Sequence, residues 1–294
     1  MYTSYLDLAQ ESGRRVHVWP VPYEGTASFG RGTKHGPEAI LRASYEIETW
    51  DEELRTDLQD MAHFRTMDFF RAPVSGPEDC FREMLQALHR ERDPAADLLL
   101  TLGGEHSVAL APITFYAEQH PDMVVLQLDA HADLRESFQS SRYSHACVMG
   151  RARDQKLPLV QLGIRSLSSK ESAYIASTPP NELLCLFAWQ LQAPEDAARR
   201  VREFIQGRPL YISFDADAYD PAILPGTGTP EPGGIDYGWL QRFWSELFRG
   251  GIRLLGLDFC ELAPIPAAGV VSESVAVRSI NRILACALQP EARG

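Results

Sequence analysis

The chain has 294 residues, of which 45% are hydrophobic, so it can bury a substantial core in one large α/β domain or two small ones. Forty acidic side chains against 28 basic ones give a net charge of -12, which disfavours binding to nucleic-acid phosphates. It has no basic and apolar leader, no run of 18 apolar residues and no C-x-x-C pair among its five cysteines, so we expect no signal peptide, no membrane span and a cytoplasmic location.

Short apolar runs bounded by Gly, Pro and Asp predict strands that are buried on both faces. They lie at residues 16–19, 98–102, 123–128, 159–162, 183–187, 210–214 and 252–257. Helical spacing between them predicts helices at residues 37–50, 78–92, 107–120, 194–206, 237–248 and 272–288. This alternation predicts a parallel sheet covered by helices. With no repeat and no long polar linker, we expect a single domain over residues 1–294.

The segment after residues 98–102 is the first that suggests chemistry. Two glycines, Gly103 and Gly104, permit a tight turn, and His106 then stands at the start of the next helix. The functional crevice of an open parallel sheet lies outside the carboxyl ends of its strands, which is where His106 falls. A lone histidine at a helix start is also a common packing residue, so this segment alone leaves both interpretations open.

The segment after residues 123–128 places three metal-competent side chains among small ones, as Asp129-Ala130-His131-Ala132-Asp133. If the strand conformation persists, the two-residue period puts Asp129, His131 and Asp133 on one face. A polar loop whose acids cap a helix is the alternative, but it does not require this alternation. The pattern therefore favours a metal site.

Two further strands are followed by carboxylates. Asp215 and Asp217 come after residues 210–214, and Glu261 comes after residues 252–257. A turn-rich loop explains the Pro-Gly-Thr segment at residues 225–230, but it does not explain two acids at the end of a buried strand. A lone glutamate is usually a rim charge, so Glu261 becomes a candidate only through its neighbours.

Six candidate ligands are thus predicted at one edge of the sheet: His106, Asp129, His131, Asp133, Asp215 and Asp217. Four carboxylates packed together repel one another unless cations compensate them. An oxygen-rich set with imidazole and without thiolate suits Mn²⁺, and Zn²⁺, Co²⁺, Ni²⁺ and Fe²⁺ remain alternatives. We therefore expect two Mn²⁺ per chain.

Three of these segments, at residues 103–107, 129–133 and 213–221, resemble the signatures of the ureohydrolase (arginase and agmatinase) family in the same order. The resemblance extends from about Pro22 to the C-terminal helix. Residues 22–26, 36–40, 143–149 and 163–166 are most similar to agmatinases of bacterial and archaeal type. The resemblance implies a three-layer αβα fold with a mainly parallel sheet, a binuclear Mn²⁺ centre, and a homotrimer or homohexamer.

The resemblance also implies a role for each candidate residue. His106 and Asp133 would bind one ion, His131 and Asp217 would bind the other, and Asp129 and Asp215 would bridge both. His145 falls where the family has its proton-shuttling histidine, and Glu261 falls where a carboxylate holds the substrate guanidinium.

Two positions depart from the family pattern. Glu105 stands where the first signature often has Asp, and we expect it to lie behind the ligands without affecting metal binding directly. Arg135 follows Asp133 closely, where arginases have an Asn near the amino-acid end of the substrate, which argues against arginine. Arg135 could repel a distal ammonium or attract a carboxylate, but we expect Glu136 to neutralise it.

The predicted function is hydrolysis of agmatine to putrescine and urea by a metal-dependent enzyme of polyamine biosynthesis. The alternatives are a sister ureohydrolase acting on guanidinobutyrate, arginine or another guanidine, a metal-dependent amide hydrolase, and a non-catalytic paralogue. Six ligands with two bridging aspartates favour the ureohydrolase, because amide hydrolases of similar fold need one ion and non-catalytic relatives generally lose ligands.

Overall fold

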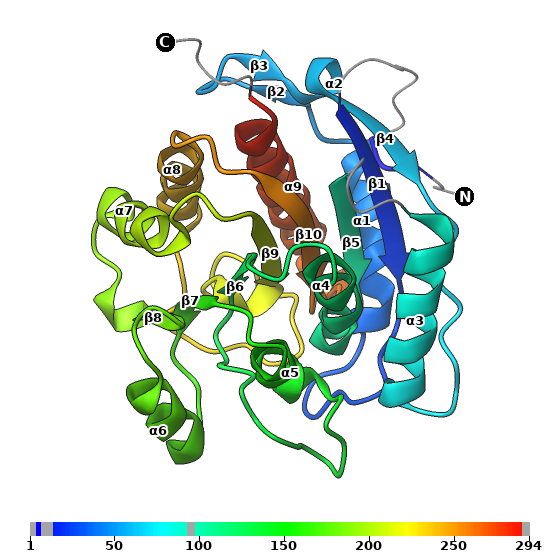
Figure 1. Cartoon of the computed structure of the whole chain (residues 1–294). Helices are drawn as coiled ribbons and strands as arrows, with labels where there is room; N and C mark the ends of the chain where they lie inside the picture. The colour runs from blue at the N-terminus through cyan, green and yellow to red at the C-terminus, as the bar shows by residue number, and fades with distance from the viewer. Residues whose placement is uncertain (1–3, 7–13, 93–97, 290–294) are drawn as a thin grey trace.

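An eight-stranded sheet runs through the computed structural model, which describes residues 4–6, 14–92 and 98–289 (Figure 1). The strand order is β4-β1-β5-β10-β9-β6-β7-β8, and all neighbours pair in parallel. The strands are β1 (Arg14–Val21), β4 (Ala62–Thr66), β5 (Leu98–Gly103), β6 (Val124–Leu128), β7 (Leu159–Ile164), β8 (Leu183–Phe187), β9 (Leu210–Asp215) and β10 (Leu254–Cys260). A small antiparallel hairpin joins β2 (Trp50–Asp51) to β3 (Thr56–Asp57). The parallel sheet predicted from the alternating pattern is confirmed.

Helices cover both faces of this sheet (Figure 1). They are α1 (Gly36–Ser44), α2 (Leu58–Met61), α3 (Pro77–Glu91), α4 (Leu110–Ala117), α5 (Val148–Asp154), α6 (Ser169–Ser177), α7 (Pro194–Ile205), α8 (Tyr237–Phe248) and α9 (Val271–Leu288). One buried cluster joins α1, α7, α8 and α9 to alternate strand residues such as Leu100 and Leu126. The other joins α3, α4 and α5 to intervening residues such as Leu99 and Val125. The fold is therefore a three-layer αβα sandwich.

Helix α7 illustrates how the sequence produces these layers. Pro194 stands in its first turn, where a missing backbone N–H costs nothing. Its buried residues recur at helical spacing, from Ala197 through Val201 to Ile205, and they form an apolar stripe that faces the sheet. The helix ends at Gln206, whose φ of 51° is left-handed.

The sequence prediction missed several elements and misplaced some boundaries. The edge strand β4 and helices α5 and α6 were not predicted, and the helix expected at residues 37–50 ends at Ser44 because Tyr45 begins the approach to the hairpin. The helix expected at residues 107–120 begins as the 3₁₀ turn η2 (His106–Ala109) and ends at Ala117. Among the described residues, no helix is both long and apolar enough to span a membrane.

The strand order brings the chemically suggestive segments together. Strands β5, β10, β9 and β6 are consecutive neighbours at the centre of the sheet, and all four run in the same direction. The last residue of β9 is Asp215, and the segments that follow β5, β10 and β6 carry His106, Glu261 and Asp129, respectively. Because the carboxyl ends of parallel strands share one edge, these four residues meet there.

Candidate metal centre

His106 is held at the first residue of η2 by a tight turn. Gly104 permits that turn, because a Cβ there would lie 2.1 Å from the carbonyl oxygen of Tyr23. The His106 side chain is 1% exposed, and its Nε2 lies 2.9 Å from Ser213 Oγ, which donates to Asp258 Oδ1 at 3.0 Å. Since that hydroxyl donates its only proton to Asp258, it accepts from Nε2–H, and Nδ1 is left to face the carboxylates.

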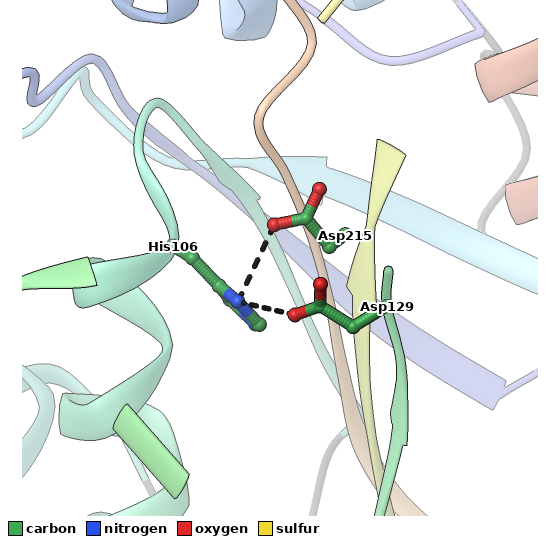
Figure 2. Close-up of side chains that lie close together, drawn as sticks. All are labelled: His106, Asp129 and Asp215. Carbon is green, nitrogen blue, oxygen red and sulfur yellow. Dashed lines mark ion pairs between the residues drawn. The ribbon is translucent and has the colours of Figure 1, made fainter. Parts of the chain in front are cut away.

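Three carboxylates surround this nitrogen. His106 Nδ1 lies 3.0 Å from Asp133 Oδ2, 3.1 Å from Asp129 Oδ2 and 3.4 Å from Asp215 Oδ2. Figure 2 shows His106, Asp129 and Asp215 pointing toward one another from three different segments. We call these three residues, whose donor atoms lie within 4.8 Å of one another, the inner group.

A second cluster shares Asp129 with the first. His131 Nδ1 lies 3.0 Å from Asp217 Oδ2 and 3.6 Å from Asp129 Oδ1. Asp129, His131 and Asp217, whose donor atoms also lie within 4.8 Å, form what we call the outer group. Asp129 therefore turns one oxygen toward each histidine, which is the arrangement that a bridging carboxylate requires. Asp215, which the sequence prediction made a second bridge, belongs to the inner group.

Local backbone bonds explain why these side chains converge. The β6 strand ends at Leu128, so the persistent strand predicted through residue 133 is reduced to one bridge between His131 and Ser166. Asp133 reaches the cluster because its backbone is left-handed, with φ 52°. Asp215 Oδ1 accepts from the Asp217 N–H at 2.9 Å, and Asp217 Oδ1 accepts from the Ala130 N–H at 3.0 Å. These bonds lock the β6 and β9 loops together.

The electrostatics of the cluster call for cations. Burial and then repulsion from Asp129 raise the pKa of Asp133 to about 7, and burial and then repulsion from Asp217 raise the pKa of Asp215 well above its usual value. When all four buried carboxylates are ionised they carry four negative charges, which two divalent cations would balance. Two imidazoles and four carboxylates form a nitrogen and oxygen donor set suited to first-row divalent metals. The residues therefore fit a pair of metal ions.

A cavity of about 300 Å³ opens above the two groups. His145 and Glu261 line it together with His106, His131, Asp133 and Asp215. Ser28, Phe138, Ser166, Ser168 and Thr229 also contribute to its wall. A substrate in this cavity would thus meet both predicted non-ligand residues and the candidate ligands at once.

His145 lies in the wall of the cavity at the start of the 3₁₀ turn η3 (His145–Cys147). Its Nδ1 lies 3.0 Å from Thr26 Oγ1, and its ring meets that of Phe138 edge-on, with centroids 5.6 Å apart. Burial, reinforced by repulsion from the two histidines of the cluster, lowers the pKa of His145 to about 4. Its imidazole is therefore neutral near pH 7.

Glu261 follows β10 with a left-handed φ of 63°. Its backbone N–H donates to the Gly104 carbonyl at 2.7 Å, and its Oε1 accepts from the His106 N–H at 2.7 Å. Its side chain is buried, and burial raises the pKa of Glu261 well above its usual value. One carboxylate oxygen is thus tied to the turn that carries His106.

The comparisons with known proteins agree with this geometry. The family model described as Arginase family matches residues 14–286. The chain belongs to the arginase family. It is 32% identical over 92% of its length to the N(1)-aminopropylagmatine ureohydrolase of Synechocystis sp., of which it covers 86%. The protein of the same name from Thermus thermophilus is 35% identical over 85% of this chain and is covered over 83% of its own length.

A solved structure supports the same assignment. The proclavaminate amidino hydrolase from Streptomyces clavuligerus superposes with a TM-score of 0.85 at 26% identity, covering 97% of each chain. This arginase-family chain is accordingly a hydrolase of the ureohydrolase type, as the sequence signatures predicted.

Arg135 corrects one sequence prediction. Its Nε lies 3.8 Å from Glu171 Oε2, and its guanidinium stacks 4.9 Å above the Phe138 ring. Glu136, the partner expected from the sequence, lies 3.7 Å from Arg142 instead. The prediction failed because the buried Glu171 is 36 residues away in sequence, in the capping box of α6. This arginase-family member thus partly neutralises its rim cation through α6.

Arg165, Glu231 and Thr26 are residues beside the centre whose positions the sequence prediction did not find. The Arg165 guanidinium donates to the carbonyls of Asp217 and Glu231 at 2.6 and 2.8 Å, so it clamps the outer loop. Glu231 Oε1 lies 3.8 Å from His131 Nε2. No local sequence pattern predicts these contacts, because each contact joins segments that are distant in sequence.

Glu105, by contrast, lies where it was expected, behind the candidate ligand His106. It is fully buried, and burial raises its pKa, while hydrogen bonds from Ser107 and Thr26 oppose that rise. Its side chain does not belong to either the inner or the outer group among the described residues.

Proposed function

We propose that the chain hydrolyses the guanidino group of agmatine, giving putrescine and urea. The observation that carries this proposal is the pair of His/Asp groups sharing Asp129 on the floor of one cavity, in a chain of the arginase family. We further propose that residues 1–294 form one catalytic domain, that the ions are Mn²⁺, and that the enzyme is a cytoplasmic homotrimer or homohexamer.

A second candidate substrate is N(1)-aminopropylagmatine. The relatives from Synechocystis sp. and Thermus thermophilus, at 32% and 35% identity, carry that substrate in their names. The same guanidino group would be cleaved, and only the amine end of the substrate would differ. We therefore expect the choice between the two amines to depend on cavity-wall residues outside the two groups, such as Phe138, Ser168 and Arg135.

The proposed ligand assignment is the one that the family resemblance implies, and the two groups support Asp129 as a shared residue. His106 and Asp133 would hold one ion, His131 and Asp217 the other, and Asp129 and Asp215 would bridge both. When bound, two divalent cations supply a water molecule acidic enough to act as a nucleophile near neutral pH. The chain's own contribution is to fix the six donors on loops that are bonded to one another.

Glu261 and His145 would act on the substrate itself. A carboxylate at Glu261 can accept hydrogen bonds from the planar guanidinium and orient its carbon. The departing amine nitrogen needs a proton as its bond to that carbon breaks, and the imidazole of His145 can deliver it. In total, one guanidinium and one water become one ammonium and one urea, so atoms and charge balance.

The test is urea release by the Mn²⁺-loaded protein, offered agmatine, N(1)-aminopropylagmatine, arginine, guanidinobutyrate and guanidinopropionate at equal concentration. We expect the highest kcat/KM for agmatine. Preference for N(1)-aminopropylagmatine would select the second candidate, and activity on a guanidino acid alone would overturn both amine substrates. If the metal-loaded protein released urea from none of the five compounds, the proposed reaction would be overturned.

The variant His145→Ala tests the proton transfer separately. We expect it to bind metal as the wild type does and to release urea roughly 10² to 10⁴ times more slowly. Metal content would be measured by elemental analysis of the same samples. Full activity in His145→Ala would contradict the proton-transfer role.

A further inference from the structure

The buried carboxylate of Glu105 accepts hydrogen bonds from Thr26 and Ser107. The Thr26 backbone N–H reaches Oε2 at 2.6 Å, and the hydroxyls of Thr26 and Ser107 reach Oε1 at 2.7 and 2.5 Å. The backbone N–H can only donate, and both hydroxyls point their protons at Oε1. Glu105 is therefore a fixed acceptor directly beneath Thr26.

Thr26 connects this acceptor to His145. Its Oγ1 lies 3.0 Å from His145 Nδ1, and it also accepts from the His145 backbone N–H at 3.1 Å. A hydroxyl has one proton, and here that proton goes to Glu105. The hydroxyl oxygen can then only accept from the ring, so Nδ1 must carry the hydrogen. The other ring nitrogen, Nε2, is left without one and lies 3.5 Å from Ser28 Oγ, a residue of the cavity wall.

We propose that Glu105 and Thr26 are positioning residues that hold His145 in the tautomer with its proton on Nδ1, so that Nε2 exchanges protons with the reacting groups. This inference rests on the proposed function. A proton taken up at Nε2 from the attacking water would leave on the departing amine, and the imidazole would return to the same tautomer. The Nδ1–H···Thr26···Glu105 chain would stay intact throughout and would hold the transient imidazolium in the same orientation.

The surroundings of the ring strengthen this inference. Phe138 meets the imidazole at 85°, and Arg135 stacks on Phe138, so the 135–145 loop braces the ring on one side. On the other side of the ring, Thr26 Oγ1 bonds both the backbone N–H and the Nδ1 of His145. A flip of the ring about its Cβ–Cγ bond would put Cδ2 in the place of Nδ1 and would therefore break the bond to Thr26.

Three variants separate the Thr26 hydroxyl from its surroundings. Thr26→Val removes the hydroxyl and keeps the shape, while Thr26→Ser restores it. Ser107→Ala is the matched control, because it removes another hydroxyl from the same Glu105 oxygen without touching His145. All three would be compared at equal metal content and with their melting temperatures recorded.

Two readouts test the inference. The first is the ¹⁵N spectrum of the His145 ring in protein loaded with diamagnetic Zn²⁺, assigned by comparison with His145→Ala. The second is kcat and KM for urea release. We expect Thr26→Val to lose the Nδ1–H tautomer and to lower kcat by roughly 10- to 100-fold with KM changed little, and we expect Thr26→Ser and Ser107→Ala to keep both within about twofold.

An unchanged tautomer and kcat in Thr26→Val would overturn the inference. Equal losses in Thr26→Val and Ser107→Ala would also overturn it, because the effect would then come from Glu105 alone. If the wild type hydrolysed none of the guanidines, the proposed function would fail, and the ¹⁵N spectrum would still decide whether Thr26 sets the tautomer.

Discussion

The inner and outer groups use the same ligand types at different depths. The His106 side chain is 1% exposed, and its Nε2 is tied to Ser213 and, through it, to the buried Asp258. The His131 side chain is 28% exposed, and the acid nearest its Nε2 is Glu231, itself 38% exposed. The buried histidine is held in place by a hydrogen-bonded partner and the exposed one is not, so we expect the inner group to retain its ion more firmly even though the side-chain types match.

Asp129 should give the largest effect, because it is the residue that the two groups share. We expect Asp129→Ala to lose both ions and to lower urea release by more than about 100-fold. Elemental analysis and urea assays on the same preparation would check this. The exposed Asp122→Ala, which removes the same charge far from the site, should behave as wild type. A variant that kept one tightly bound ion would show that the groups are independent.

The difference in depth predicts unequal losses from the two histidines. His131→Ala should keep about one ion per chain, held by the buried inner group, whereas His106→Ala should disturb the interior and lower the occupancy of both sites. Stepwise removal of metal from the wild type with a chelator should likewise release the outer ion first. Equal occupancy in the two variants would show that depth does not control affinity.

The predictability of these groups from sequence also differs. All six candidate ligand positions could be named because each lies at the end of a recognisable apolar strand or within a few residues after it, and parallel strands bring such positions to one edge. The backbone conformation of the loops could not be predicted. Asp133 reaches the cluster through a left-handed backbone, and Asp217 reaches it through a 3₁₀ turn rather than an extended strand. Such local conformations depend on bonds from distant segments, as from Ala130 to Asp217.

The helices and strands that the sequence prediction missed can be explained in a similar way. β4 is a short edge strand with polar residues, as in Ala-His-Phe-Arg-Thr, so no continuous apolar run marks it. Helix α6 is mostly polar and partly exposed, yet the capping box of Ser168 and Glu171 was a readable signal for its start. The partner of Arg135 lies in that unpredicted helix, and this is why the sequence pointed to Glu136 instead.

Arg165 should matter mainly for the outer group. Arg165→Met keeps much of the side-chain volume but leaves the carbonyls of Asp217 and Glu231 without this donor. We expect about 2–3 kcal/mol lower stability and roughly 10- to 100-fold weaker binding of the outer ion, with the inner ion less affected. Denaturant unfolding and metal titration would measure both effects. Equal weakening of both ions would argue for a general loss of structure instead.

The smallest expected effect concerns Asp220, which supports the loop that carries Glu231, the residue beside His131. Its oxygens accept hydrogen bonds from the N–H groups of Ala222, Gly233 and Gly234. These bonds lower the pKa of Asp220, and the bond from Ala222 has the largest effect. A lowered folded pKa means that the stabilisation is present above the unfolded pKa of about 3.9 and is lost as pH falls through the folded pKa.

We therefore expect Asp220→Asn to cost at most about 1 kcal/mol of unfolding free energy at pH 7. The difference from wild type should shrink as the pH is lowered below about 4, where the wild-type carboxylate also becomes protonated. Urea unfolding curves at several pH values would show this convergence. A difference that stayed constant with pH would assign the effect to shape rather than to charge.

The left-handed backbones of Asp133 and Glu261 have a consequence for engineering. Glycine adopts such φ values readily, whereas other residues there cost about 1–3 kcal/mol. A directed-evolution campaign selected on thermostability alone would therefore drift toward glycine at both positions and discard two site carboxylates. Gln206, equally left-handed but at the end of α7 and outside the site, offers the same gain without that loss. A thermostability library should thus vary Gln206 and hold Asp133 and Glu261 fixed.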